Sequence, residues 1–226
     1  MDIQLHYIEQ GRGKPLILLH GNGEDCGYFR HQITYFRKKY RVIAIDTRGH
    51  GNSPRGEAQF SIRQFADDLK EFMDEMEIPK ASILGFSDGG NIAVIFALRY
   101  PGMVERLILN GANLNPGGVK RWVQIPVEIG YRLALFFAKF SAGAKLKAEI
   151  LGLMVKDPMV LPEELEKIHI KTLVIVGDHD MIKENHTRLI ADHLPDASLV
   201  ILPGNHSAAA KNPEEFNYQV EKFLEE

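Results

Sequence analysis

The chain has 226 residues, of which 45% are hydrophobic, and this size and composition predict one large globular domain. The formal net charge of −3 gives no electrostatic reason to expect a nucleic-acid partner. Cys26 is the single cysteine, and no basic segment followed by a long apolar one opens the sequence. We therefore expect no disulfide, no signal peptide and cytoplasmic residence.

Seven short runs rich in Ile, Val and Leu predict strands. In chain order they cover residues 3–8, 15–19, 41–45, 81–84, 106–109, 172–176 and 198–202. Several runs are continuously apolar rather than alternating, as expected for strands that a parallel sheet buries on both faces. The first run does alternate, and a short segment containing Gly11 and Gly13 joins it to the second. We therefore expect an antiparallel hairpin at one edge of the sheet.

Helical patterns separate most of these strands. Ser61 is a suitable N-cap for a helix over residues 62–76, whose apolar side chains recur at steps of three and four residues. Further helices are expected over residues 91–99, before Pro101, and over residues 214–224. Strands alternating with helices predict an α/β fold with an open, mostly parallel sheet and helices on both faces.

About 60 residues separate the fifth predicted strand from the sixth, more than one crossover helix needs. We expect a helical cap over residues 113–162, inserted between core segments 1–112 and 163–226. One interpretation is a pair of helices that enlarges the core. The other, which we favour, is a lid over the carboxyl edge of the sheet, where open α/β sheets bind ligands. Charged side chains interrupt this apolar region, so we expect no spanning helix and no membrane partner.

Aromatic side chains are concentrated in the same insertion. We predict that an apolar substrate pocket is lined by Trp122, Tyr131, Phe136 and Phe137. The alternative is that these side chains pack only against one another.

The sequence Gly85-Phe86-Ser87-Asp88-Gly89 matches the pattern Gly-x-Ser-x-Gly between a predicted strand and a predicted helix. A serine at so sharp a turn lies close to its neighbours, which leaves room only for small residues two positions away on either side. Its Oγ would then stand at the tip of the sheet, near the N–H groups of the following helix. An ordinary turn with a helix-capping serine is the alternative. Ser87 is the candidate nucleophile.

A serine hydroxyl needs a base to become a nucleophile, and the chain has nine histidines. His206 directly follows the last predicted strand, where a loop lies over the carboxyl edge of the sheet, so it is the candidate base. The base in turn needs an anionic partner that fixes its tautomer. Asp178 and Asp180 are the two acids that directly follow the sixth predicted strand.

The other histidines have less specific settings. We interpret His20 and His50 as structural residues of turns, and His186 and His193 as surface residues of a helix. The segment around His179 also offers two carboxylates as metal ligands. We expect no metal site there, because no second donor cluster at metal spacing accompanies it.

The oxyanion that forms in acyl transfer needs preorganised donors. We predict one at the backbone N–H of Asp88, the residue after the candidate nucleophile, and one at the backbone N–H of Asn22, in the glycine-rich loop after the second strand. The alternative is that this loop only turns the chain into its helix.

Taken together, these motifs resemble the α/β-hydrolase fold superfamily over nearly the whole chain. The resemblance is carried by residues 20–23 (HGNG), residues 46–53 (DTRGHGNS), the Ser87 turn and the loops of Asp180 and His206. In this family the triad occurs in the order Ser, Asp, His, and the resemblance implies Asp180, rather than Asp178, as its acid. Residues 46–53 are normally a structural turn. The N-terminal segment is too short for the family's additional antiparallel strand, so we expect a seven-stranded sheet.

The resemblance implies a cofactor-free serine hydrolase that acts, as a monomer or homodimer, on a small ester-like molecule: an ester, lactone, thioester or amide. Carbon–carbon hydrolases and perhydrolases use the same triad, and some relatives bind ligands without turnover. The Asp88 carboxylate has two interpretations. It attracts a cationic substrate group, such as the amine of an amino-acid ester, or it points aside and stabilises the start of its helix.

Overall fold

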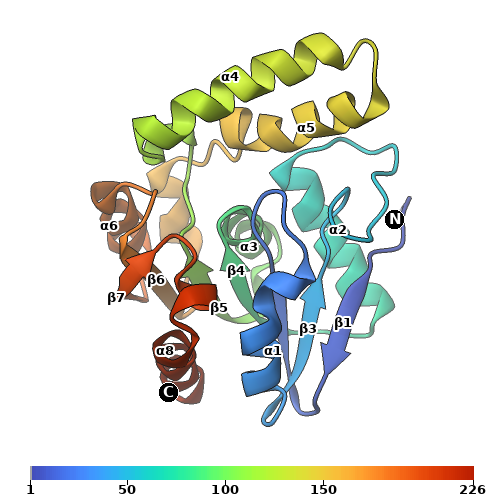
Figure 1. Ribbon diagram of the computed structural model, residues 1–226. Coiled ribbons are helices and arrows are strands. Elements are labelled where there is room, and N and C mark those ends of the chain that lie inside the picture. The colour runs from blue at the N-terminus through green and yellow to red at the C-terminus, as the bar shows by residue number, and fades with distance from the viewer. Residues whose placement is uncertain (1) are drawn as a thin grey trace.

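In the computed structural model, which describes residues 2–226, seven strands form one sheet in the order β1-β3-β2-β4-β5-β6-β7 (Figure 1). Every neighbouring pair is parallel except β1 and β3. The strands are β1 (Tyr7–Gln10), β2 (Lys14–Leu19), β3 (Tyr40–Ile45), β4 (Ala81–Phe86), β5 (Val104–Asn110), β6 (Thr172–His179) and β7 (Ala197–Asn205). The predicted seven-stranded, mostly parallel sheet is confirmed.

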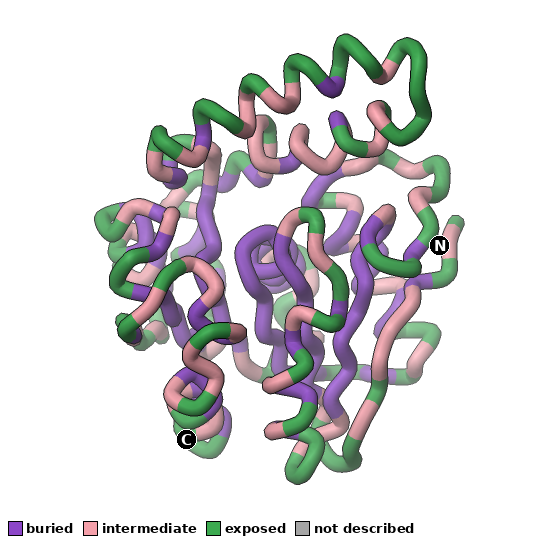
Figure 2. The backbone as a smooth tube through the Cα atoms, in the orientation of Figure 1, coloured by how far each residue is buried: buried purple, intermediate pink, exposed green. Residues whose placement is uncertain are grey.

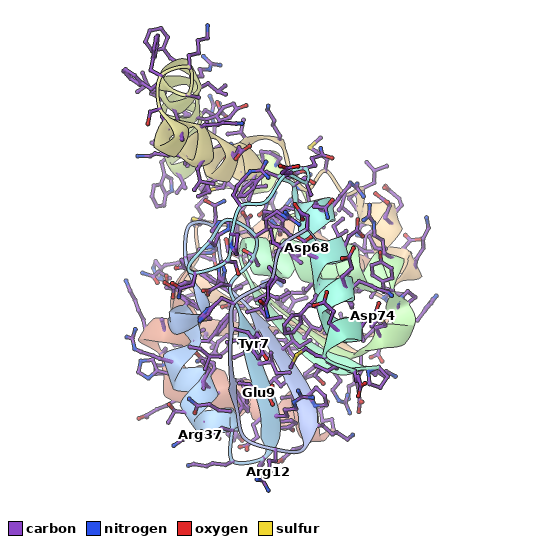
Figure 3. All side chains as sticks on the ribbon, turned by 90° about the vertical axis from the view of Figure 1, so that its right-hand side faces the viewer. Tyr7, Glu9, Arg12, Arg37, Asp68 and Asp74 are labelled. Atoms are coloured by element: carbon purple, nitrogen blue, oxygen red, sulfur yellow. The ribbon has the colours of Figure 1, made fainter. Side chains whose placement is uncertain are left out.

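The prediction of a hairpin at the edge of the sheet is wrong about which strands pair. Strand β1 is antiparallel and lies at the edge, but it pairs with β3 rather than with β2. Figure 3 shows this edge, with Tyr7 and Glu9 on β1 and Arg12 at the turn that follows. At that turn Gly11, with φ 82°, passes so close to the end of β3 that a Cβ would lie 2.2 Å from the Tyr40 carbonyl oxygen. The chain therefore crosses the end of β3, and β2 pairs on its other side.

Helices cover both faces of the sheet. One face carries α2 (Ile62–Glu75), α3 (Asp88–Arg99) and α6 (Glu184–His193), and the other carries α1 (Arg30–Phe36), α7 (Ala208–Lys211) and α8 (Pro213–Glu225). Four short 3₁₀ segments, η1 (Cys26–Phe29), η2 (Pro101–Met103), η3 (Pro116–Gly118) and η4 (Pro162–Lys167), lie in the connections. In β4, Ile83 packs into one apolar cluster and Leu84 into the other, which explains why the central strands read as continuous apolar runs. Figure 2 shows these strands as buried.

Local signals fix the helix ends. The Ser61 hydroxyl accepts a hydrogen bond from the Gln64 N–H (3.2 Å), which confirms the predicted start of α2. Helix α3 starts at Asp88, three residues earlier than predicted, because Ser87 itself is the residue that precedes its first turn.

Two further helices, α4 (Arg121–Phe137) and α5 (Ala142–Lys156), follow β5 and pack against each other beyond the carboxyl edge of the sheet (Figure 1). The stem of this insertion is fixed to the segment after β6: the Lys183 N–H donates to the Gly118 carbonyl, and the Lys120 N–H to the Met181 carbonyl. His186 is buried there and accepts from the Leu114 N–H (3.0 Å), so its prediction as a surface residue is wrong. Among the described helices, none has the length and hydropathy that crossing a bilayer requires.

Candidate active site

Ser87 lies at a strained turn between β4 and α3. Its φ of 54° and ψ of −119° are rare for a residue with a side chain and cost about 1–3 kcal/mol. Two hydrogen bonds hold the turn: the Ser87 N–H donates to the Asn110 carbonyl (2.8 Å), and its carbonyl accepts from the Asn91 N–H (3.0 Å). The residue has only 7% of its surface exposed. A serine is therefore held, against its backbone preference, at the carboxyl end of a central strand.

The glycines around Ser87 are required for clearance. A Cβ on Gly85 would lie 2.2 Å from the Gly89 carbonyl oxygen, and a Cβ on Gly89 would lie 2.0 Å from the Leu19 carbonyl oxygen. A Cβ on Gly90 would approach the Ala112 methyl group to 2.9 Å. Because these contacts are mainly with backbone atoms, no side-chain rotation relieves them. The structure confirms the steric reason that the sequence suggests for this pattern.

Asp180 and His206 lie in contact. Asp180 Oδ1 accepts from His206 Nδ1 (2.7 Å) and from the Ile182 N–H (2.8 Å). Since a carboxylate only accepts, Nδ1 carries the proton of the neutral imidazole and Nε2 keeps its lone pair. His206 Nε2 is buried, and no hydrogen bond joins it to another described residue. This is the tautomer that a general base requires.

The loops after β6 and β7 are held together at their bases. At Gly177 a Cβ would lie 2.4 Å from the Gly204 carbonyl oxygen, so the two strands meet more closely than a side chain would permit. Asp178 Oδ1 accepts from the Gly204 N–H (2.9 Å) and from His179 Nδ1 (2.7 Å). Asp178 therefore anchors the loop that carries His206, while Asp180 contacts the imidazole itself.

Two residues that the sequence did not single out position the imidazole. Phe86, directly before Ser87, has its ring centroid 4.8 Å from that of His206. Gly111, with φ 63°, also lies so close that a Cβ would be 2.8 Å from His206 Cε1. Tyr28 in turn stacks on Phe86, with ring centroids 4.3 Å apart. The sequence does show a glycine, Gly111, directly after β5. Its role could not be predicted because it depends on His206, nearly a hundred residues later in the chain.

The two residues chosen as oxyanion donors are linked through their side chains. Asn22 Nδ2 donates to Asp88 Oδ2 (2.8 Å) and to the Ile150 carbonyl of α5 (2.8 Å). Asp88 Oδ1 also accepts from Asn91 Nδ2 (3.2 Å). Burial raises the pKa of the Asp88 carboxyl to about 6, against these hydrogen bonds, which lower it. Both carboxylate oxygens thus have protein donors, as expected if this side chain points aside from the substrate.

Residues 46–53 have the structural role that was expected. Asp46 is fully buried and accepts from the backbone N–H groups of Cys26 and Asn52. His20 Nδ1 donates to the Gly21 carbonyl, its Nε2 accepts from the Thr47 N–H, and burial lowers its pKa to about 4. His50 is buried in the same turn.

One group of metal-ligating residue types, His6, Cys26 and Asp46, has its donor atoms within 4.8 Å of one another. The Asp46 oxygens are already occupied by His6 Nδ1 and by two backbone N–H groups. Burial, followed by the neighbouring Asp46, raises the pKa of the Cys26 thiol to about 12, so the thiolate that binds metals is disfavoured. The donor set does not fit a metal. Asp178 and Asp180 bind different partners and do not converge on one either.

The pocket prediction fails for three of its four aromatic residues. Tyr131 lines a cavity of about 760 Å³ between the cap and residues 55–61. Trp122, Phe136 and Phe137 are instead 70%, 61% and 53% exposed. The helical period explains the difference for Trp122 and Phe136, which lie nearly opposite Tyr131 on α4. Phe137 lies on a flank of the helix, in its last turn.

The chain matches the family described as alpha/beta hydrolase fold over residues 14–150. It is 26% identical to 3-oxoadipate enol-lactonase 2 of Acinetobacter baylyi, over 99% of this chain and 94% of that protein. It is 28% identical to the human serine hydrolase BPHL, over 99% of this chain and 84% of that protein. A solved structure, the meta-cleavage product hydrolase of Pseudomonas fluorescens, superposes with a TM-score of 0.81 at 26% identity and covers 99% of this chain and 94% of that one.

These relatives are hydrolases, and their similarity extends over nearly the whole chain. The family match covers more than half of the residues and includes the Ser87 turn. The fold, the turn and the sequence match agree, and the chain belongs to the alpha/beta hydrolase fold family.

Proposed function

We propose that this protein is a cofactor-free serine hydrolase that cleaves a small carboxylic ester, lactone, thioester or amide through an acyl-enzyme. The observation that carries the proposal is the 2.7 Å hydrogen bond from His206 Nδ1 to Asp180, which leaves the Nε2 lone pair unpartnered. The imidazole lies against Phe86, the residue directly before Ser87, with ring centroids 4.8 Å apart. No hydrogen bond between His206 and Ser87 Oγ is formed among the described residues. A half-buried imidazole with a fixed tautomer, packed against the residue before a strained serine, has no evident structural purpose.

In the proposed reaction Ser87 Oγ attacks the carbonyl carbon while His206 Nε2 takes the hydroxyl proton. Asp180 stabilises the imidazolium, which then gives its proton to the leaving group as the single bond between the carbonyl carbon and the leaving-group oxygen, sulfur or nitrogen breaks. Water, deprotonated by the same nitrogen, attacks the acyl-enzyme and releases the acid and Ser87. No step requires a metal, an oxidant or a cofactor.

The negative charge on the carbonyl oxygen would be received by the backbone N–H groups of Asn22 and Asp88. Donors of this kind contribute about 3 kcal/mol each to the transition state. Their positions are supported by the side-chain hydrogen bond that ties the two residues together (2.8 Å). We further propose that the cap, residues 113–162, is the lid of this site, since α5 supplies the Ile150 carbonyl to the same Asn22 side chain.

A lactone is a cyclic ester, and the similarity to an enol-lactonase supports including lactones among the substrates. The similarity to a meta-cleavage product hydrolase supports one alternative, hydrolysis of an activated carbon–carbon bond with the same residues. Perhydrolysis, and ligand binding without turnover, are less supported because the relatives compared above are hydrolases.

A substrate panel separates these functions. It contains p-nitrophenyl esters of short and medium acyl chains, simple lactones and a vinylogous diketone that only carbon–carbon hydrolysis cleaves. We expect turnover of esters or lactones by the wild type and its loss in His206→Ala. Turnover of the diketone alone would establish the alternative. Absence of any turnover, with an active-site phosphonate still bound, would favour a ligand-binding role.

A further inference from the structure

The outward side of α4 is an exposed apolar surface. Twelve large apolar side chains are exposed in the described part of the chain, and eight of them lie between residues 122 and 140. Trp122, Ile129, Leu133 and Phe136 share one side of the helix, and Phe140, in the turn after it, lies beside Phe136 with ring centroids 6.3 Å apart. We call these five residues the α4 stripe. Trp122 and Phe140, at its two ends, are 70% and 78% exposed. Figure 2 shows most of this outermost helix as exposed.

The fold does not account for this surface. The opposite face of α4 already makes the contacts with α5 and the core, through residues such as Tyr131 and Ala134. Figure 3 shows the cap standing away from the body at one end, so no other element covers its outer side. Contiguous exposed apolar surface on a globular protein marks a site of interaction.

The charges beside the stripe have one sign. Residues 120–147 contain six basic residues and one acidic residue, although the whole chain carries −3. Arg121, Arg132 and Lys139 are exposed. The first two are eleven residues apart on the same flank of the helix, and Lys139 lies in the turn after it, next to Phe140. Among the described residues no carboxylate pairs with them. The one acid, Glu128, is only partly exposed and accepts from Gln124 Nε2.

We propose that α4 binds the surface of an anionic lipid bilayer, with the α4 stripe in the interface and the flanking cations on the lipid headgroups. A helix with an aromatic and aliphatic face beside basic side chains has the composition of helices that lie in the membrane interface. Each Arg or Lys near an anionic surface adds about 1 kcal/mol to binding.

A second copy of the chain fits this surface less well. In a two-fold dimer the same surface would face itself, and residues 120–147 would offer the partner's six basic side chains only one carboxylate, Glu128. An anionic bilayer supplies the apolar phase and the negative charge together. The sequence predicts no membrane partner because no segment spans a bilayer, but lying on its surface requires only an amphipathic helix. This proposal is independent of the hydrolase chemistry.

Trp122 is the only tryptophan of the chain and belongs to the stripe, so its fluorescence reports directly on the proposal. The full-length protein is titrated with vesicles of phosphatidylcholine alone and with vesicles in which part of it is replaced by phosphatidylglycerol. We expect a blue shift and protection from acrylamide with the anionic vesicles, at least about tenfold weaker binding to the neutral ones, and weakening by salt. Flotation of the same mixtures measures binding independently.

Two double variants and their controls test the two parts of the surface. Phe136→Ser with Phe140→Ser removes apolar contact, and Arg132→Glu with Lys139→Glu reverses charge. We expect each to weaken vesicle binding about tenfold or more, with unchanged ester turnover in solution. The controls, exposed residues elsewhere, are Tyr218→Ser and the pair Lys80→Glu with Lys167→Glu. These should bind like the wild type.

Absence of binding to either vesicle would overturn the proposal, as would equal binding to both. So would a blue-shifted, protected Trp122 in the vesicle-free protein at concentrations where light scattering detects a dimer. That last result would assign the surface to a second copy of the chain.

Discussion

The Asn22 side-chain amide donates to the Asp88 carboxylate at 2.8 Å, and this hydrogen bond joins the loop after β2 to the first turn of α3. The same amide also donates to the Ile150 carbonyl of α5. One side chain therefore connects the two proposed oxyanion donors with the cap. A change at Asn22 should affect the site without touching the proposed triad.

Asn22→Ala should lower kcat/KM for an ester about tenfold to a hundredfold, because the loop that carries one oxyanion donor loses its anchor. It should also lower the free energy of unfolding by about 1–3 kcal/mol, since the buried Asp88 carboxylate loses a donor. Steady-state kinetics and urea unfolding measure the two effects. Asn185→Ala, an exposed position on α6, is the matched control. Equal behaviour of the two variants would refute the connection.

Asp88 should make stability depend on pH. Its folded-state pKa, raised by burial from 3.8 to about 6, means that the folded protein holds this proton more tightly than the unfolded chain. The protonated Asp88 carboxyl therefore stabilises the folded protein. Its contribution to the free energy of unfolding is fully present below about pH 4 and is lost as the pH rises through about 6, a decrease of about 3 kcal/mol. Urea unfolding of wild type and Asp88→Asn at both ends of this window measures it. The wild type should lose stability relative to the variant with rising pH. A difference between the two that does not change with pH would contradict the buried setting of Asp88.

Gly89→Ala should disrupt the turn, because the added methyl group would lie 2.0 Å from the Leu19 carbonyl oxygen. We expect a loss of more than about 3 kcal/mol in unfolding free energy, or no recoverable folded protein. Gly102→Ala is the matched control, since no atom lies within 4 Å of its Cβ position, and it should stay within about 0.5 kcal/mol of wild type. Thermal unfolding compares them. A Gly89→Ala protein as stable as the control would contradict the claim that the turn has no room for a Cβ at this position.

Asp180→Asn should leave the fold intact and lower kcat about 10³- to 10⁴-fold, because an amide does not hold the imidazole in the required tautomer. Asp178→Asn is the neighbouring comparison. Its side chain binds the Gly204 N–H and His179 rather than His206, so we expect a loss of less than about tenfold. Steady-state kinetics on one ester measures both. A larger loss of kcat in Asp178→Asn than in Asp180→Asn would contradict these assignments.

Much of this architecture could be predicted because its signals are local. Continuous apolar runs identified the central strands, Ser61 identified the start of α2, and the glycines around Ser87 identified the turn. Each depends on neighbours in the sequence or on a steric requirement at one position.

The errors concern contacts between distant segments. Nothing local shows that β3 lies between β1 and β2, or that His186 is buried against the stem of the cap. The aromatic residues of α4 were assigned to a pocket because apolar side chains are normally covered. Trp122 is exposed because other residues of α4, such as Tyr131 and Ala134, form the face of the helix that contacts the rest of the protein. Which face of an apolar helix points inward depends on its partner.

Turnover of a p-nitrophenyl ester by Ser87→Ala, with Ser207→Ala as the control beside the proposed base, tests the central assignment most directly. If Ser87 is the nucleophile, kcat should fall by about 10⁵- to 10⁶-fold and no acyl adduct should appear in the intact mass. Ser207→Ala should turn over at nearly the wild-type rate and acquire the adduct. A Ser87→Ala protein that hydrolyses the ester as fast as the wild type would show that the reaction occurs without this serine.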